Sequence, residues 1–425
     1  MRELSGIIIL GALSLLVGLV SGVICALFHM ALTHADALRV QAVTHAQASP
    51  WVGLPLLVGG TAAAAAFAAG LVRRVAPEAS GSGIPHVEAV LEQEMQPARG
   101  WLIPVKFTGG VLAIGSGLAL GREGPSVQMA AATANVIGRF FRRNWEDRRA
   151  LLAGGAGAGL AAAFNAPAAG AVFVLEELVG KFEPRIAVVA LGTSIGAIFA
   201  SRGLLGGALD FPLPQLSGGG PEMLPLFLLM GVLVGLVSVV YNRSLLGTLR
   251  LADRIGGPIE LRAAVIGGAV GLLAFAAPDL VGGGDAMVTR MTQEQVALAL
   301  LPLLFLVRLL LSTVSYAAGT PGGLFAPMLA LGAITGLAFG LIVQALAPGL
   351  GVAPAAFAVV AMGAFFAGAV RAPLTGIILV IEMTGASDII LPLLTACFGS
   401  MLVTQALREP PIYVSLRERA AQSER

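Results

Sequence analysis

The chain has 425 residues, of which 57% are hydrophobic and 12% charged, and its mean hydropathy is +0.88. A soluble domain has about 25% charged residues, so these proportions exclude a water-soluble enzyme or scaffold of this size. The 26 basic and 24 acidic residues leave a net charge of +2, which provides no basic field for nucleic acid. Cys25 and Cys397 lie far apart in apolar runs, and the four histidines lack metal-ligand spacing. We therefore expect no disulfide framework, no metal and no other cofactor.

Long stretches without Asp, Glu, Lys or Arg follow one another along the chain. In chain order they cover residues 4–35, 51–72, 150–175, 223–242, 309–370 and 389–407. A helix that crosses a bilayer needs about 20 mostly apolar residues. The first stretch is too long for a signal peptide and more membrane segments follow it, so we expect it to be a retained helix. The pattern predicts an all-α, multi-pass integral membrane protein.

Two apolar pieces are too short to cross a membrane. Residues 107–121 end at Arg122 and Glu123, and residues 372–381 lie between Arg371 and Glu382. Non-helical backbone is tolerated inside a membrane only where it is buried in protein or lines a wet cavity. We therefore expect these pieces to be helices that end within the membrane.

The two halves of the chain repeat a sparse pattern. The repeated positions, 201 to 206 residues apart, are Pro77 and Pro278, Gly81 and Gly282, Gly83 and Gly284, Lys106 and Arg308, Gly121 and Gly323, and Glu176 and Glu382. Paired broken segments in two halves are a pointer to the binding site of a transporter. The pattern predicts one membrane domain made of two halves, residues 1–205 and 206–425.

Three glycine-proline turns precede expected helices. They are Gly81-Ser82-Gly83-Ile84-Pro85, Gly121-Arg122-Glu123-Gly124-Pro125 and Gly323-Leu324-Phe325-Ala326-Pro327. In each turn we expect the proline at the first helical position, where its missing N–H costs nothing. Helix N-termini expose unpaired N–H groups and suit anions. Together the turns predict a site for a permeating anion, although the glycines could also serve helix packing alone.

These turns resemble the three filter segments of the CLC chloride channel and transporter family. The segments Ala163-Phe164-Asn165-Ala166-Pro167 and Arg371-Ala372-Pro373-Leu374-Thr375-Gly376 are also similar to that family, and the resemblance runs from Leu4 to about Leu416. It implies about eighteen tilted, partly re-entrant helices in two inverted halves. It also implies a homodimer in the lipid bilayer with one anion path per subunit. It is strongest to the prokaryotic H⁺/Cl⁻ exchangers, which implies a bacterial inner membrane and cytoplasmic termini. The chain ends soon after Leu416, so no cytoplasmic nucleotide-binding domains are expected.

The resemblance assigns chloride ligands to four positions. The hydroxyls of Ser82 and Tyr413 would face the central anion, and Leu324 and Phe325 would offer their backbone N–H groups. Ser82 resembles the chloride-preferring members, because the nitrate-preferring ones have Pro there. From chemistry alone, Ser82 could be a helix cap and Tyr413 an interfacial tyrosine.

The resemblance also assigns proton roles to two carboxylates. Glu123 would be the outer gate, which occupies an anion position when ionised and swings out when protonated, with Arg122 as a structural counter-charge. Glu177 aligns with the internal proton-transfer acid of the exchangers, an acid that channel members usually lack. We therefore favour chloride–proton exchange over a passive chloride channel. Glu176 has a repeat mate in Glu382, which suggests a structural role instead.

Other readings have weaker support in the sequence. An intramembrane hydrolase would need a base for Ser82, and only His86 is near it in sequence. An amino-acid or cation symporter would have carboxylates or carbonyl-rich breaks where this chain has glycine-proline helix starts. We expect no enzyme activity. Glu88 and Lys106 lie among apolar residues, and because a buried lysine needs a partner, we expect them to pair.

Overall fold

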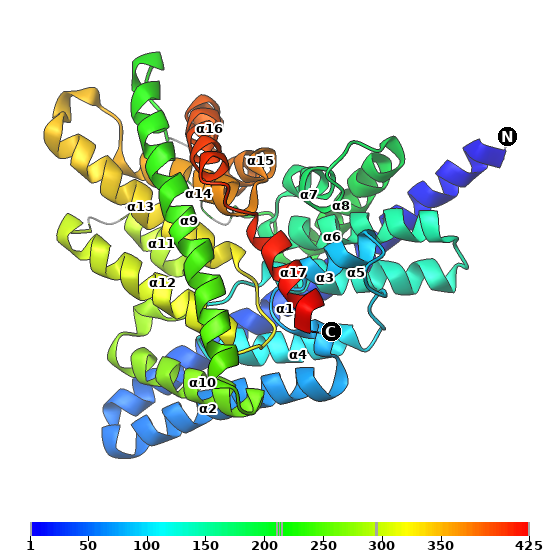
Figure 1. The fold of residues 1–425 in the computed structure, drawn as a ribbon, viewed down its shortest axis with the longest axis horizontal. Helices are drawn as coiled ribbons and strands as arrows, with labels where there is room; N and C mark the ends of the chain where they lie inside the picture. Colours follow the sequence, from blue (N-terminus) through cyan, green and yellow to red (C-terminus); the bar gives the residue numbers. More distant parts are fainter. Residues whose placement is uncertain (1, 210, 212, 214–215, 294–295, 424–425) are drawn as a thin grey trace.

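The computed structural model describes residues 2–209, 211, 213, 216–293 and 296–423. In this part of the chain it contains seventeen α-helices and no β-strand, only two isolated β-bridges (Figure 1). The all-α prediction is confirmed, and the helix number is close to the expected eighteen. The helices are α1 (Arg2–Ala48), α2 (Pro50–Val75), α3 (Ile84–Leu91), α4 (Leu102–Gly115), α5 (Glu123–Phe140), α6 (Trp145–Phe164), α7 (Pro167–Phe173), α8 (Pro184–Leu205), α9 (Leu224–Ile255), α10 (Ile259–Ala276), α11 (Asp285–Gln293), α12 (Leu301–Ala317), α13 (Phe325–Leu346), α14 (Pro354–Val370), α15 (Pro373–Thr384), α16 (Ile390–Ala406) and α17 (Ile412–Ser423).

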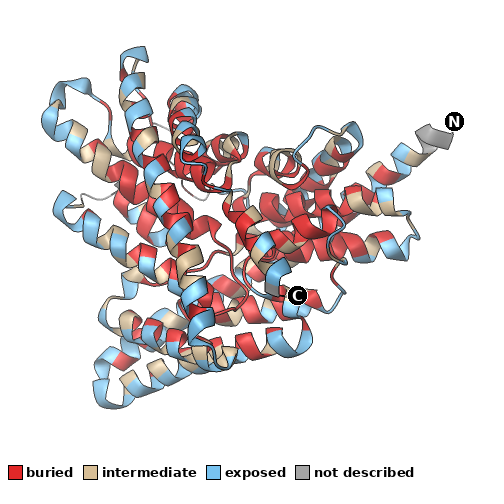
Figure 2. Ribbon diagram, viewed as in Figure 1, coloured by how far each residue is buried: buried red, intermediate tan, exposed pale blue. Residues whose placement is uncertain are grey.

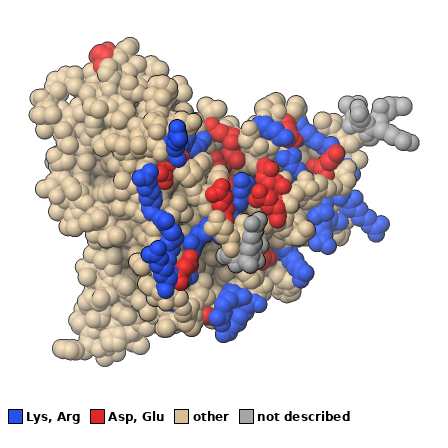
Figure 3. All heavy atoms as spheres, in the orientation of Figure 1, with Lys and Arg blue, Asp and Glu red and all other residues tan. Residues whose placement is uncertain are grey.

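The outer helices expose apolar side chains. Eight helical segments among the described residues are long and apolar enough to cross a membrane. On α8, for example, Val188, Leu191, Ile195 and Phe199 are all exposed and lie at helical spacing along one face. Figure 2 shows exposed residues spread over the outer helices, and Figure 3 shows charged side chains gathered over only part of one face. Such apolar surfaces suit lipid and not water, so the protein is an integral, multi-pass membrane protein.

The inner helices are buried along most of their length. In α5, α6, α13 and α14 nearly every residue away from the ends is buried. These helices pack closely because glycines remove side chains from the contacts: Gly159 lies against the backbone of Ser126, and Gly336 lies against the backbone of Phe357. The high glycine content therefore serves close packing at the centre of the fold, as in other membrane helix contacts.

Backbone geometry recurs at the spacing of the sequence pattern. Ala76 and Ala277 both have φ −149°, with ψ 82° and 76°, and each precedes a short 3₁₀ turn. The left-handed residues also recur in pairs, namely Gly81 and Gly282, Gly83 and Gly284, Gly117 and Gly319, and Asn165 and Arg371. Matching positive φ angles mean that the chain makes the same turns at these places.

The two isolated β-bridges join segments that are far apart in sequence. Gly81 pairs with Pro321 in a parallel bridge, and Gly121 pairs with Gly323 in an antiparallel one. Gly121 N donates to Gly323 O at 2.8 Å, and Gly323 N donates to Gly121 O at 2.6 Å. These bonds tie together the three segments that precede α3, α5 and α13.

Candidate functional site

The three glycine-proline turns meet at the centre of the molecule and start three helices. These helices begin at Ile84, Glu123 and Phe325. The turn prolines therefore occupy the second or third helical position, so the prediction of the first position is wrong. The physical cost is the same, because the first four N–H groups of a helix all lack an intrahelical partner. None of the three helices has a side-chain cap at its start, which leaves backbone N–H groups available to a ligand.

Ser82 and Tyr413 lie together although 331 positions separate them in the sequence. Both are fully buried, and the two side chains are close enough to interact. Among the residues that the structure describes, neither hydroxyl has a hydrogen-bond partner. A buried polar group without a partner costs about 1–3 kcal/mol. Two such hydroxyls side by side indicate a place where a bound acceptor would complete the hydrogen bonding.

The start of α13 packs closely around this place. Leu324 and Phe325 are fully buried. The Phe325 ring stacks on Tyr413 with 6.1 Å between centroids and packs against Phe366 at 4.6 Å. These aromatic contacts fix both the tyrosine and the N-terminus of α13. The side chains of Leu324 and Phe325 are apolar, so only their backbone could bind an anion.

Glu123 is a buried carboxylate at the first position of α5. Its side chain is 1% exposed and interacts with the backbone N–H of Ala326 at the start of α13, and with Arg122 and Asp285. Within the described part of the chain, its Oε2 has no hydrogen-bond partner. The carboxylate thus occupies the position at a helix N-terminus that suits an anion.

Arg122 connects the turn before α5 to neighbouring helices. Its Nε donates to the carbonyl of Ala163 at 3.2 Å, and its Nη1 lies 3.4 Å from Nε2 of His29. The interaction with the Glu123 carboxylate adds an opposite charge. Arg122 is therefore placed by contacts with α1 and α6 as well as by its charge.

Glu177 lies on a π-helical turn, Val174–Leu178, that continues α7. Its side chain interacts with Glu88, Glu176 and Tyr413. Glu88 is 4% exposed, and neither of its carboxylate oxygens has a hydrogen-bond partner among the described residues. The sequence does not predict that these two acids lie near each other. The only sequence signal was the position of Glu88 on the short helix that Ser82 precedes.

The predicted pair between Glu88 and Lys106 is wrong. Lys106 is fully buried, and its Nζ donates to the carbonyls of Ala79 at 3.0 Å and Gly81 at 2.7 Å. The chain at this turn itself supplies the acceptors, two backbone carbonyls. The cation therefore stabilises the segment that carries Ser82.

Arg308 binds the corresponding turn of the second half. Its Nη1 donates to the carbonyls of Leu280 at 3.0 Å and Gly282 at 2.8 Å, and its Nη2 donates to Gly283 at 2.6 Å. Like Lys106, it is buried. The two cations are 202 positions apart and make the same kind of contact with a glycine turn.

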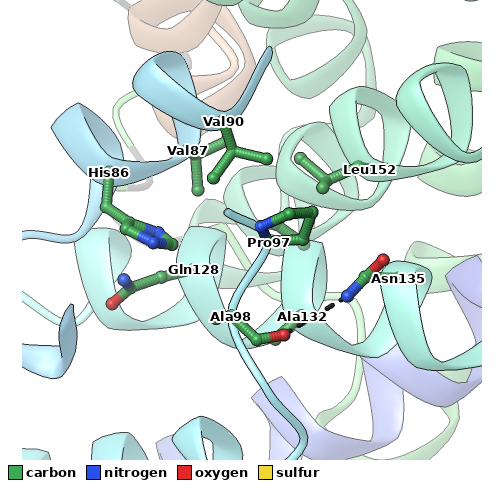
Figure 4. A pocket seen from close by; sticks show the side chains of 10 residues that line it. His86, Val87, Val90, Pro97, Ala98, Gln128, Ala132, Asn135 and Leu152 are labelled. Carbon is green, nitrogen blue, oxygen red and sulfur yellow. Dashed lines mark hydrogen bonds between the residues drawn. The ribbon is translucent and has the colours of Figure 1, made fainter. Parts of the chain in front are cut away.

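A small cavity lies on another side of α3 (Figure 4). Its volume is about 10 Å³, and because one water needs about 10–15 Å³, it has room for one water at most. His86 and Gln128 lie at its edge. The Ser82 hydroxyl makes no hydrogen bond to His86 or to any other described residue, so it has no base in hydrogen-bonding contact. This geometry does not favour a serine hydrolase.

Comparisons with known proteins agree with this geometry. Residues 64–405 match the model of the voltage gated chloride channel family. The chain is 42% identical over 367 residues, 84% of its length and 78% of the relative's, to the H(+)/Cl(-) exchange transporter ClcA of Vibrio parahaemolyticus. It is 40% identical to ClcA of Vibrio cholerae, covering 97% of this chain and 90% of that one.

The chain also resembles solved structures of antiporters over nearly its whole length. The crystal structure of a slow cyanobacterial Cl⁻/H⁺ antiporter has a TM-score of 0.94 and 34% identity, and the match covers 98% of this chain and 99% of that one. A CLC-type fluoride/proton antiporter has a TM-score of 0.81 at 23% identity, with 97% and 98% covered, which bears on the fold alone. The chain therefore belongs to the voltage gated chloride channel family, the CLC family.

Proposed function

We propose that this protein is a secondary active transporter that exchanges chloride for protons, and that it is not an enzyme. The observation that carries the proposal is the placement of Glu123, whose carboxylate lies against the N-terminus of α13. There it competes with an anion for the same backbone N–H groups. The names of the relatives and of the cyanobacterial structure support exchange as the activity.

The anion path passes the two buried hydroxyls. Ser82 and Tyr413 would donate hydrogen bonds to a chloride ion between them, and the N–H groups of Leu324 and Phe325 would bind it from the start of α13. All of these donors are neutral. Neutral donors bind an anion tightly enough for it to enter and weakly enough for it to leave.

Glu123 acts as the outer gate and the outer proton acceptor. When ionised, it binds the helix N-terminus and closes the path. When protonated, it loses its attraction to the N–H groups, so the side chain leaves and chloride takes its place. Proton binding and chloride binding are thereby coupled at one site.

Glu177 acts as the inner proton-transfer acid. It interacts with Tyr413 but lies on a different helical segment from the filter turns. A proton can therefore reach Glu123 from the cytoplasmic side without following chloride through the inner filter. The adjacent buried Glu88 gives this route a second carboxylate.

The wider setting of the protein follows from the same proposal. We place it in a bacterial inner membrane as a homodimer with one anion path per subunit and with both termini in the cytoplasm. Residues 1–205 and 206–425 form the two halves of the transport unit. The recurring turns and the paired cations Lys106 and Arg308 support this division.

The test is the reversal potential of the purified protein in a chloride gradient, measured with and without a pH gradient. An exchanger reverses at a potential between those of chloride and protons, and this potential moves when the pH gradient changes. A reversal at the chloride Nernst potential that ignores pH would indicate a passive channel and refute exchange.

A further inference from the structure

Two short helices, α7 and α15, bind each other through carboxylates. Glu382, near the end of α15, reaches the first turn of α7. It accepts a hydrogen bond from Ala168 N at 3.1 Å through Oε1 and another from Ala169 N at 2.8 Å through Oε2. The carboxylate thus caps a helix that belongs to the other half of the chain.

Glu176 makes the matching contact in the opposite direction. It accepts hydrogen bonds from Leu374 N at 2.9 Å and Thr375 N at 2.7 Å, in the first turn of α15. The Thr375 hydroxyl donates a third bond to it at 2.7 Å. The two carboxylates, Glu176 and Glu382, are called the reciprocal pair below. Each is 206 positions from its counterpart, and so are the backbone donors that they bind.

The bonding of the reciprocal pair follows from the sequence at the helix starts. Pro167 and Pro373 are the first residues of α7 and α15 and have no N–H group. The next two N–H groups of each helix lack intrahelical partners, and one carboxylate takes both. Hydrogen bonds from N–H groups to a carboxylate are charge-assisted, and the negative charge is favoured at the positive end of the helix dipole.

The reciprocal pair holds the segment that carries Glu177. This segment begins at Pro167 and ends with the π turn Val174–Leu178. Glu382 fixes its start, and Glu176, which belongs to the π turn, fixes its end on α15. Glu177 is the next residue, and its side chain interacts with Glu88 and Tyr413. π turns of one helical turn are frequent at functional sites.

We propose that Glu382, together with Glu176, is a positioning residue for proton transfer by Glu177. This inference rests on the proposed function, because it assigns Glu177 the transfer of the proton. Glu382 touches neither the buried hydroxyls nor Glu123, so its loss changes the placement of Glu177 and not the anion site. Loss of Glu382 should therefore lower the proton flux and leave the chloride flux nearly unchanged.

The test compares Glu382→Gln and Glu176→Gln with wild type in vesicles, recording chloride and proton flux together. A glutamine keeps the shape but turns an NH₂ group toward a backbone N–H, so one of the two cap bonds is lost. Loss of a helix cap changes a local equilibrium about twofold to thirtyfold, and we expect the proton-to-chloride ratio to fall about fivefold. Chloride flux should stay within about a factor of two of wild type.

Two further variants complete the experiment. Asp388→Asn removes the same charge from an exposed residue just after α15 and should leave the ratio unchanged. Thr375→Val removes one donor to Glu176 at nearly constant volume, so it should lower the ratio about twofold even if a glutamine variant fails to fold.

The outcomes separate this inference from the proposed function. If wild type moves no protons with chloride, the proposed function fails and the positioning role fails with it. If wild type is coupled and Thr375→Val and the folded glutamine variants keep the wild-type ratio, only the positioning role is overturned. A lower chloride flux at an unchanged ratio would likewise overturn it, because that is the result of a purely structural role.

Discussion

A single methyl group at Gly124 should weaken anion binding at the Ser82 site. Gly124 is the second residue of α5 and packs directly on the turn of the first filter segment. A Cβ added there would lie 2.5 Å from Ser82 Oγ, 2.7 Å from Ser82 O and 3.0 Å from Ser82 Cα. Ordinary contacts of a Cβ are about 3.4–4 Å, so Ser82 would have to move by several tenths of an ångström.

The surroundings of Ser82 do not allow this movement freely. The preceding residue, Gly81, donates its N–H to Thr320 O at 3.1 Å and accepts from Gly322 N at 3.0 Å. Lys106 binds the same carbonyl of Gly81. Overpacking a tight site costs about 1–3 kcal/mol. If the whole of this cost weakens the free energy of chloride binding, chloride affinity should fall about 5- to 150-fold.

The assay is calorimetric titration of the purified Gly124→Ala variant with chloride, followed by chloride flux in vesicles. Gly60→Ala is the matched control, because it adds the same methyl to α2 where nothing lies within 4 Å. We expect the control to bind chloride as wild type does. Wild-type chloride affinity in a folded Gly124→Ala protein would refute the convergence of α5 and Ser82 on the anion.

Three further predictions concern the gate, the selectivity and the buried lysine. Glu123→Gln imitates a permanently protonated gate, so chloride flux should persist and lose its pH dependence while proton movement stops; proton pumping by this variant would contradict the gate assignment. Ser82→Pro removes the hydroxyl donor and should raise the coupling of nitrate, whereas wild type should prefer chloride over nitrate in vesicle flux; tight fluoride selectivity of wild type would contradict this. Lys106→Met removes the side-chain donor to the carbonyl of Ala79 and one of the two donors to the carbonyl of Gly81, which keeps its bond from Gly322 N. A buried carbonyl that loses its donor costs about 1–3 kcal/mol, so thermal unfolding in detergent should occur below the wild-type temperature; an unchanged midpoint would contradict the bonding of this lysine.

The sequence predicts the helix starts well because glycine and proline have strong local effects. Gly81 and Gly83 adopt the left-handed backbone that favours glycine, and the helices begin within these turns. The prolines are one or two positions later than expected. Proline is tolerated at any of the first helical positions, so the pattern defines the turn but not the first residue of the helix.

Partners of buried charges could not be predicted from the sequence. The sequence pairs Lys106 with Glu88 because both lie among apolar residues, but the acceptors of Lys106 are backbone carbonyls, which a sequence does not distinguish. The repeat related Glu176 to Glu382 and indicated a structural role for Glu176. A constant offset identifies equivalent positions in the two halves, but it does not show which residues touch. The repeat therefore does not predict that Glu176 caps α15 and that Glu382 caps α7.

The π turn was also absent from the prediction. Glu177 follows Pro167 by ten residues, which is about three turns of an ordinary helix. The wider turn at Val174–Leu178 changes the direction of every side chain that follows. No residue type marks a π turn in a sequence. Glu176, which lies in this turn, binds the first turn of α15, a contact that the sequence does not show.

The most direct test of exchange follows chloride and protons in the same vesicles, with a chloride electrode and a pH electrode. Vesicles are loaded with high chloride at equal pH on both sides. Chloride leaving through wild type should drive protons inward and make the outer medium more alkaline, and Glu177→Gln should stop the protons while chloride efflux continues. Chloride efflux through wild type with no proton movement would contradict the account.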